Sequence, residues 1–133
     1  MPKVLDALPI TTAVTNATSA AVGSSAAVPG GLLVQIDFVY GSGGTSGKVW
    51  LQTSLDGSSW IDIANMTFTT ASKSRIYNLS ADTAFVTPYT ITDGTLADDT
   101  AKDGIIGGVY RTKLTTIGTY AATTLSVTIL AGS

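Results

Sequence analysis

The segment KVWLQTSLDGSSWIDIA, residues 48–64, has the pattern of a β-hairpin. Apolar and polar side chains alternate from residue 48 to residue 55, which is the two-residue period of a strand. Asp56 and Gly57 follow, and this pair tolerates the positive φ angles that hairpin turns need. Alternation resumes at residues 60–64, so the two runs are expected to pair with each other.

The same turn also contains an acid beside hydroxyls, which raises the question of catalysis. Asp56 precedes Ser58 and Ser59, but a serine nucleophile needs a neighbouring base. The chain contains no His and no Cys, which excludes imidazole-based triads, thiol nucleophiles and the usual zinc sites. We interpret SLDGSSW as a structural turn, and we expect no enzymatic activity and no cofactor.

The rest of the chain repeats this strand pattern. LLVQIDFVY, residues 32–40, has apolar side chains on one side and Gln35 and Asp37 on the other. Turn-forming Ser, Asp and Gly separate the further segments. The sequence predicts an all-β fold, an antiparallel β-sandwich or jelly-roll-like domain of about seven or eight strands. Further strands are expected at residues 66–70, 74–79, 84–91, 108–117 and 122–130.

Two segments stand apart from the strand series. Residues 1–30 are rich in small residues, with one strand candidate at 10–15 and too few large side chains to build core. They are interpreted as an N-terminal arm or edge strand, beside a sandwich domain at residues 31–133. Residues 92–107 form a long acidic loop, whose spacing does not match a calcium-binding loop, so a solvated loop is expected. Its acids are Asp93, Asp98, Asp99 and Asp103.

Charge and hydropathy limit the possible partners. Seven basic and nine acidic residues are scattered along 133 positions, so no electrostatic stripe is available for nucleic acid. Asp6 and two prolines interrupt the first twelve residues, which predicts no secretion signal. No apolar run approaches the ~18 residues of a membrane span, so no membrane partner is expected.

Five side chains are candidates for contact with a partner protein. Trp50 lies on the more polar side of its strand, where it would be partly wet unless something covers it. Trp60 follows the turn and either closes the end of the sandwich or makes a contact. Arg111 and Lys113 share one face of a strand, and together with Arg75 they are expected to set the register of a subunit contact.

KVWLQTSLDGSSWIDIA and GGVYRTKLTTIGTYAATTLSVTI resemble small structural proteins of tailed-phage and prophage virions. In those proteins a strand runs into S-x-D-G-x-x-W, and a Y-R-x-x-x-T-x-x-G-T stretch precedes the final strand. The resemblance covers about residues 32–130. The matching positions mark the fold, so the resemblance carries over no binding residue.

The resemblance implies a capsid decoration, or cement, protein. Such a protein would bind the outside of a phage capsid and stabilise it by bridging subunits. Its partners would be the major capsid protein and copies of itself, as a homotrimer. Its location would be the virion, assembled in the host cytoplasm.

Two alternatives remain open from the sequence. The first is a tail or neck component, which would share all of these features. The second is a glycan-binding module, in which Trp50, Trp60 or Tyr89 would stack on a sugar ring.

Overall fold

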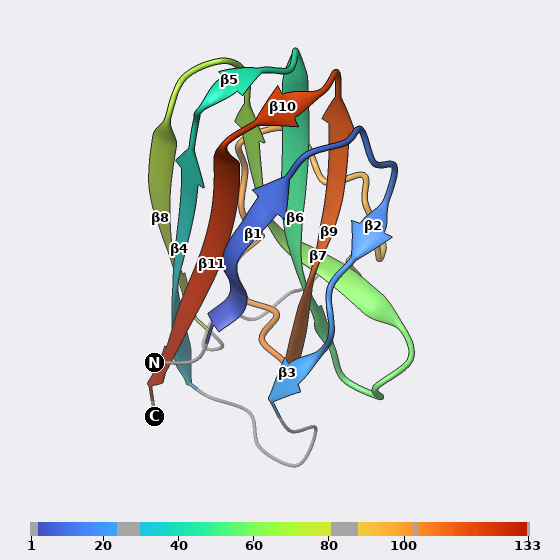
Figure 1. Ribbon diagram of the computed structural model, residues 1–133. Helices are drawn as coiled ribbons and strands as arrows, with labels where there is room; N and C mark the ends of the chain where they lie inside the picture. The colour runs from blue at the N-terminus through green and yellow to red at the C-terminus, as the bar shows by residue number, and fades with distance from the viewer. Residues whose placement is uncertain (1–2, 24–29, 81–87, 103, 133) are drawn as a thin grey trace.

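The computed structural model describes residues 3–23, 30–80, 88–102 and 104–132. The described part contains eleven strands and no helix, and therefore no helix that could cross a membrane. Two antiparallel sheets face each other across a common core (Figure 1). The predicted all-β class with antiparallel sheets is confirmed. Seven strands have eight to ten residues and four have only two, against about seven or eight strands predicted from the sequence.

The first sheet contains both ends of the described chain. Its strand order is β1-β11-β4-β8, and every neighbouring pair is antiparallel. Its members are β1 (Lys3–Ile10), β4 (Gly31–Val39), β8 (Lys73–Ser80) and β11 (Thr123–Gly132).

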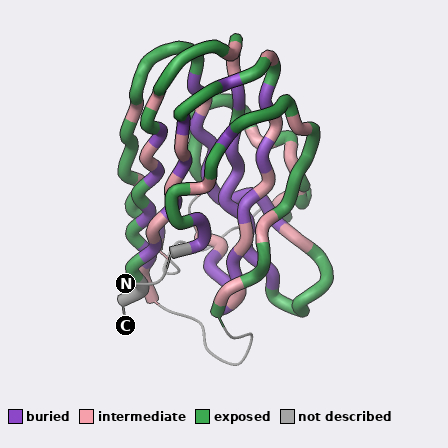
Figure 2. The backbone as a smooth tube through the Cα atoms, in the orientation of Figure 1, coloured by how far each residue is buried: buried purple, intermediate pink, exposed green. Residues whose placement is uncertain are grey.

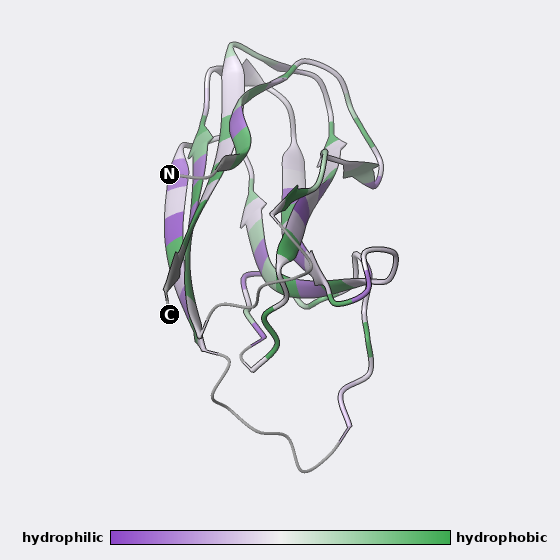
Figure 3. Ribbon diagram, turned by 90° about the horizontal axis from the view of Figure 1, so that it is seen from below, coloured by the Kyte–Doolittle hydropathy of each residue, from purple (hydrophilic) through white to green (hydrophobic). Residues whose placement is uncertain are grey.

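The second sheet is built around the hairpin predicted from the sequence. Its order is β2-β9-β6-β7, and β3 pairs with a further part of β9. Its members are β2 (Ala17–Thr18), β3 (Val22–Gly23), β6 (Ser46–Ser54), β7 (Trp60–Phe68) and β9 (Val109–Ile117). A short pair, β5 (Ser42–Gly43) and β10 (Tyr120–Ala121), lies at one end, and the view from below shows the two sheets as separate layers (Figure 3).

Alternation along β4 shows how the sequence forms the core. Leu32, Val34, Ile36 and Phe38 are buried, and the residues between them are half-buried or exposed. Figure 2 shows that buried positions recur along the strands of both sheets. Burying each large aliphatic side chain stabilises the fold by roughly 1.5–3 kcal/mol, so β4 is oriented with these side chains toward the core.

Aromatic rings close one end of the core. The ring centroids of Phe38 and Phe68 are 4.0 Å apart in a stacked arrangement. Tyr120 meets Phe38 edge-on at 5.7 Å, and its hydroxyl donates a 2.7 Å hydrogen bond to the carbonyl of Thr69. The two sheets are thereby joined by rings that come from β4, β7 and β10.

Several strand boundaries differ from those predicted. The segments predicted at 60–64 and 66–70 belong to one strand, β7, which ends at Phe68. Leu51 and Gln52 are adjacent on β6 but pair with Ala64 and Asp62, so Ile63 is the extra residue of a bulge in β7, and the alternation changes there. Residues 88–91 are not a strand, and residues 84–87 lie outside the described part. The strand candidate at 10–15 was wrong, since β1 ends at Ile10.

The N-terminal segment contributes to the core, contrary to the prediction from its small residues. Val4, Leu5 and Ile10 are buried in the main hydrophobic cluster. β1 is the edge strand of the first sheet, and the chain then crosses to the second sheet and follows β9 (Figure 1). Positive φ at Ala7 and two register shifts interrupt the alternation of β1, which hid these core positions in the sequence.

Replacing Ile10 by Ala tests whether β1 is part of the folded core. We expect the free energy of unfolding to fall by about 2–4 kcal/mol, because a buried side chain is removed. The matched control is Ile117→Ala, whose side chain is 59% exposed and should change stability by less than about 0.5 kcal/mol. Urea unfolding followed by tryptophan fluorescence measures both, and equal effects would contradict this role of β1.

Candidate functional site

The hairpin turn between β6 and β7 is held by the side chain of Asp56. Its Oδ1 accepts hydrogen bonds from the backbone N–H of Ser58 at 2.8 Å and of Ser59 at 2.7 Å. Gly57 adopts a φ of 83° and donates its N–H to Ser54 Oγ. The hydrogen bonds from Ser59 and Ser58 hold the pKa of Asp56 well below its usual value. These contacts are those of a turn, as the sequence predicted.

A second loop, residues 92–102, folds against the edge of β7. The N–H of Asp62 donates to the carbonyl of Thr92 at 2.9 Å, and the N–H of Asn65 donates to the carbonyl of Thr100 at 2.8 Å. In return, the N–H of Lys102 donates to the carbonyl of Ile63 at 2.8 Å. This loop is therefore packed on the sheet, whereas the sequence predicted a solvated loop.

The carboxylate of Asp62 binds the backbone of this loop. The side chain is fully buried, and Oδ2 accepts N–H groups from Gly94 at 2.8 Å, Thr95 at 3.0 Å and Leu96 at 3.1 Å. Oδ1 accepts a further bond from Gln52 Nε2 at 2.8 Å. Consecutive backbone N–H groups form a concave donor site that suits a carboxylate. We call this arrangement the Asp62 clamp.

Positive charge surrounds the loop acid Asp93. Lys113 Nζ lies 2.6 Å from Asp93 Oδ1, and Arg111 Nη2 lies 3.7 Å from the same oxygen. Gln52 donates to Asp93 at 2.6 Å and accepts from Arg111 Nε at 2.8 Å. Desolvation opposes ionisation, but hydrogen bonds from Lys113 and Gln52 together with both cations keep the pKa of Asp93 below its usual value.

The remaining described acids of the loop are also paired. Asp98 meets Lys48 at 2.9 Å, and Asp99 meets Lys73 at 3.1 Å. Desolvation again opposes ionisation, but hydrogen bonds from Thr67 and attraction to Lys73 lower the pKa of Asp99. Asp103 lies outside the described residues, and no group of metal-ligating side chains occurs among the described ones.

Of the five predicted contact residues, Trp50, Arg111 and Lys113 lie around the 92–102 loop and its ion pairs. Trp60 lies beside Arg111. Trp50 is 5% exposed and donates its indole N–H to the carbonyl of Leu96 at 3.1 Å. Arg111 stacks over the half-buried ring of Trp60 at 4.4 Å, and Lys113 is held by Asp93. The sequence left undecided whether Trp50 is covered, and the structure shows that the 92–102 loop covers it. A partner reaches Trp50 only if the loop moves.

Arg75, the fifth predicted contact residue, lies elsewhere. It is exposed on β8, at the far side of the first sheet from β1. Its guanidinium donates a hydrogen bond to the carbonyl of the neighbouring Ser74 at 2.9 Å. Within the described residues it forms no ion pair, unlike Arg111 and Lys113.

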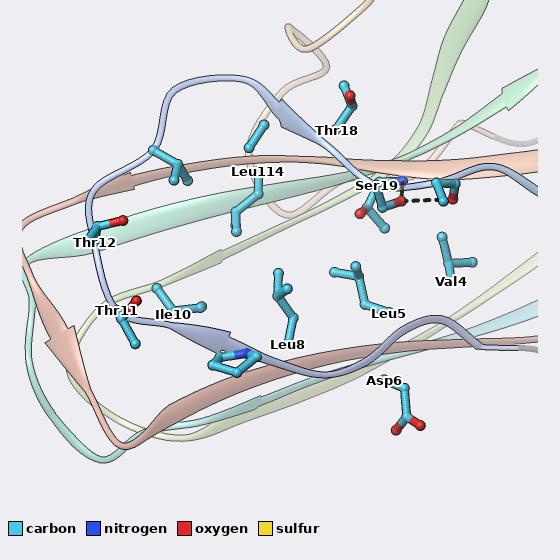
Figure 4. A pocket seen from close by; sticks show the side chains of 15 residues that line it. Val4, Leu5, Asp6, Leu8, Ile10, Thr11, Thr12, Thr18, Ser19 and Leu114 are labelled. Atoms are coloured by element: carbon cyan, nitrogen blue, oxygen red, sulfur yellow. Dashed lines mark hydrogen bonds between the residues drawn. The ribbon is translucent and has the colours of Figure 1, made fainter.

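A cleft of about 510 Å³ opens between β1 and the segment that follows it. The side chains of Leu5, Leu8, Ile10 and Leu114 point into this space, whereas Asp6 lies on the other side of β1 (Figure 4). The lining is mostly aliphatic with hydroxyl groups, so the cleft offers no acid–base chemistry. It marks the place where the N-terminal segment closes the sandwich.

The outer face of the first sheet carries an apolar surface. Leu33, Ile76 and Leu130 are 44%, 68% and 45% exposed, and they surround a shallow hollow of about 140 Å³. Val39 is 55% exposed further along the same face of β4. We call these four side chains the apolar face. The alternation of β4 and β11 contained this signal, but the sequence analysis followed only the inward side.

Comparison of the chain with protein families, with curated proteins and with solved structures found no match.

Replacing Asp62 by Asn tests the Asp62 clamp. The amide would place an N–H₂ group against backbone N–H donors and leave some of them without an acceptor, so we expect a loss of about 1–3 kcal/mol in the free energy of unfolding. Release of the loop should also shift the emission of Trp50 to longer wavelength. Asp98→Asn, which breaks an exposed ion pair, is the control and should cost less than about 1 kcal/mol. An unchanged emission spectrum in Asp62→Asn would contradict the clamp.

The lowered pKa values of Asp56, Asp93 and Asp99 predict acid sensitivity. Each group binds a proton more weakly in the folded state than in the unfolded state, where its pKa is about 3.9. Stability should therefore be constant above about pH 5 and decrease below about pH 4. Urea unfolding between pH 7 and pH 3 measures this, and Asp93→Asn should show a shallower decrease than wild type.

Proposed function

We propose that this chain is a non-enzymatic virion structural protein that binds the outside of a phage capsid and stabilises it by bridging capsid subunits. The observation that carries the proposal is the apolar face. Four of the seven large hydrophobic side chains that are exposed in the described part lie on this face: Leu33, Ile76 and Leu130 surround one hollow, and Val39 lies further along β4. A sheet face with aliphatic side chains at its centre and Ser, Thr and Gln around them has the anatomy of a protein interface.

The distribution of charge supports the same function. Four cations, Lys48, Lys73, Arg111 and Lys113, are tied to aspartates of the 92–102 loop. On the apolar face, Asp37 is the charged residue of β4, and it accepts hydrogen bonds from Gln35 and Ser74. Asp37 keeps its charge on this face, so the part that costs little desolvation to cover is the hollow lined by Leu33, Ile76 and Leu130.

The resemblance to tailed-phage structural proteins supplies the kind of partner. A rigid sandwich that binds through one face suits a cement protein on a capsid lattice. Removing residues 1–30, a natural test of an arm, would also remove Val4, Leu5 and Ile10 from the core. Single substitutions on the apolar face are the cleaner test.

Cosedimentation with purified phage particles tests the proposal. The particles come from a phage whose genome encodes this chain. The gene is deleted beforehand, so that the particles lack the protein. We expect saturable binding of the wild-type chain and at least about a tenfold loss in Leu33→Asp, because burying an unpaired carboxylate costs more than 1.4 kcal/mol. Leu55→Asp, at a position that is 62% exposed on the hairpin, is the control.

The outcomes separate the alternatives. Wild-type chain that stays in the supernatant would refute capsid binding. Binding confined to tails, visible by electron microscopy of labelled particles, would favour the tail or neck component. A glycan array tests the sugar-binding alternative, in which saturable binding should be lost in Trp60→Ala.

A further inference from the structure

The four sides of the sandwich differ in how their strand edges are protected. An open strand edge presents unpaired N–H and C=O groups, which are a template for pairing with another strand. At the β1 edge, Pro9 and the positive φ of Ala7 make the strand irregular. At the β9 edge, β2 and β3 occupy the ladder, and at the β7 edge the 92–102 loop does so. Among the described residues, β8 has none of these devices.

β8 is a regular edge strand. It pairs with β4 in unbroken register over eight residue pairs, and it contains no proline and no positive φ. On its free side, the backbone bond recorded within the described part is the one from Gly104 N–H to the carbonyl of Ser80, at the last residue of the strand. Figure 1 shows β8 at the outer edge of the first sheet.

β8 carries two cationic side chains, the exposed Arg75 and the half-buried Lys73. Lysine on an edge strand usually discourages pairing. Lys73, however, is turned inward, with its ammonium group bonded to the carbonyl of Thr67 at 2.8 Å and to Asp99 at 3.1 Å. In the middle of the strand, Ile76 is 68% exposed, the largest exposed fraction among the large hydrophobic side chains of the described part.

We propose that β8 is a dimerisation edge, at which β8 of a second copy of this chain adds antiparallel and joins the two first sheets into one continuous sheet. A two-fold axis at Ile76 places each Ile76 opposite its equivalent. Arg75 then lies opposite the partner's Tyr77, and Ser74 lies opposite the partner's Asn78. Apolar groups meet apolar groups, a cation meets an aromatic ring, and a hydroxyl meets an amide.

Other registers match less well. An axis at Arg75 would place two guanidinium groups opposite each other, which is repulsive. An axis at Tyr77 would place Ile76 opposite the partner's Asn78 and Arg75 opposite the partner's Leu79. The strand is therefore self-complementary about Ile76, which is the requirement for a two-fold contact between identical chains.

The role of the dimer rests on the proposed function. Joining the two first sheets would place two apolar faces on one continuous surface, which could then contact two capsid subunits. It also differs from the homotrimer expected from the resemblance, since a strand paired with its own copy closes after two subunits. The contact can be measured on the purified chain without particles. A monomeric chain that still binds capsids would refute the dimer and leave the proposed function intact.

Ile76→Cys provides a direct test because the chain has no cysteine of its own. Directly opposed residues of antiparallel strands have Cα atoms about 4.5–5.5 Å apart, within the range of a disulfide. We expect a covalent dimer to form under mild oxidation at least about tenfold faster than in Ile117→Cys, because pairing raises the local thiol concentration. Ile117 is 59% exposed, so it is a matched control for accessibility. Equal rates for the two variants would overturn the proposal.

Sedimentation velocity of the unmodified chain gives the second measurement. We expect a species of twice the 13.5 kDa chain mass, and a dissociation constant raised at least about tenfold in Ile76→Lys, where two ammonium groups would meet. Ile117→Lys should leave the dimer unchanged, and circular dichroism checks that both variants keep their strands. A monomer or a trimer in the wild-type chain would overturn the assignment.

Discussion

The buried carboxylate of Asp62 is the contact on which the polar half of this structure depends. It accepts backbone N–H groups from three consecutive residues of the 92–102 loop and so fixes that loop on the second sheet. Because the loop is fixed, it covers Trp50 and Gln52 on the outer face of β6, and both are as buried as the core residues beside them. A carboxylate can lie in this position because its oxygens are met by hydrogen-bond donors.

The outer faces of the two sheets are consequently very different surfaces. On the second sheet, a layer of ion pairs and hydrogen bonds connects strand residues to loop aspartates, as between Lys113 and Asp93. On the first sheet, Leu33, Ile76 and Leu130 remain exposed. The polar layer uses the available charges within the chain, and the apolar face is left for contacts with other molecules. This division is the basis of the proposed binding function.

Edges and faces would have separate roles in assembly. Three edges of the sandwich are made irregular or are occupied by the chain itself, and these devices are the ones that keep sheet proteins from uncontrolled association. With one regular edge in the described part of the chain, strand pairing would be limited to one contact, and self-association would close on itself. The outer face of the first sheet then stays accessible to a different partner.

The sequence by itself determined the class of fold and the hairpin. Alternation along residues 32–40 and 48–55, with Asp56 and Gly57 at the turn, fixes local geometry, because strand period and turn chemistry depend on neighbouring residues. The absence of His and Cys likewise followed from the sequence alone.

Only the tertiary structure decided which polar side chains are buried. Trp50 is covered by Leu96, a residue 46 positions away, and Asp62 is paired with N–H groups more than 30 positions away. No local period reports such contacts, because they are made by backbone groups that every residue has. The core role of Val4 and Leu5 was hidden for a related reason: register shifts in β1 break the alternation, and the pairing with β11 that places both residues inside joins opposite ends of the chain.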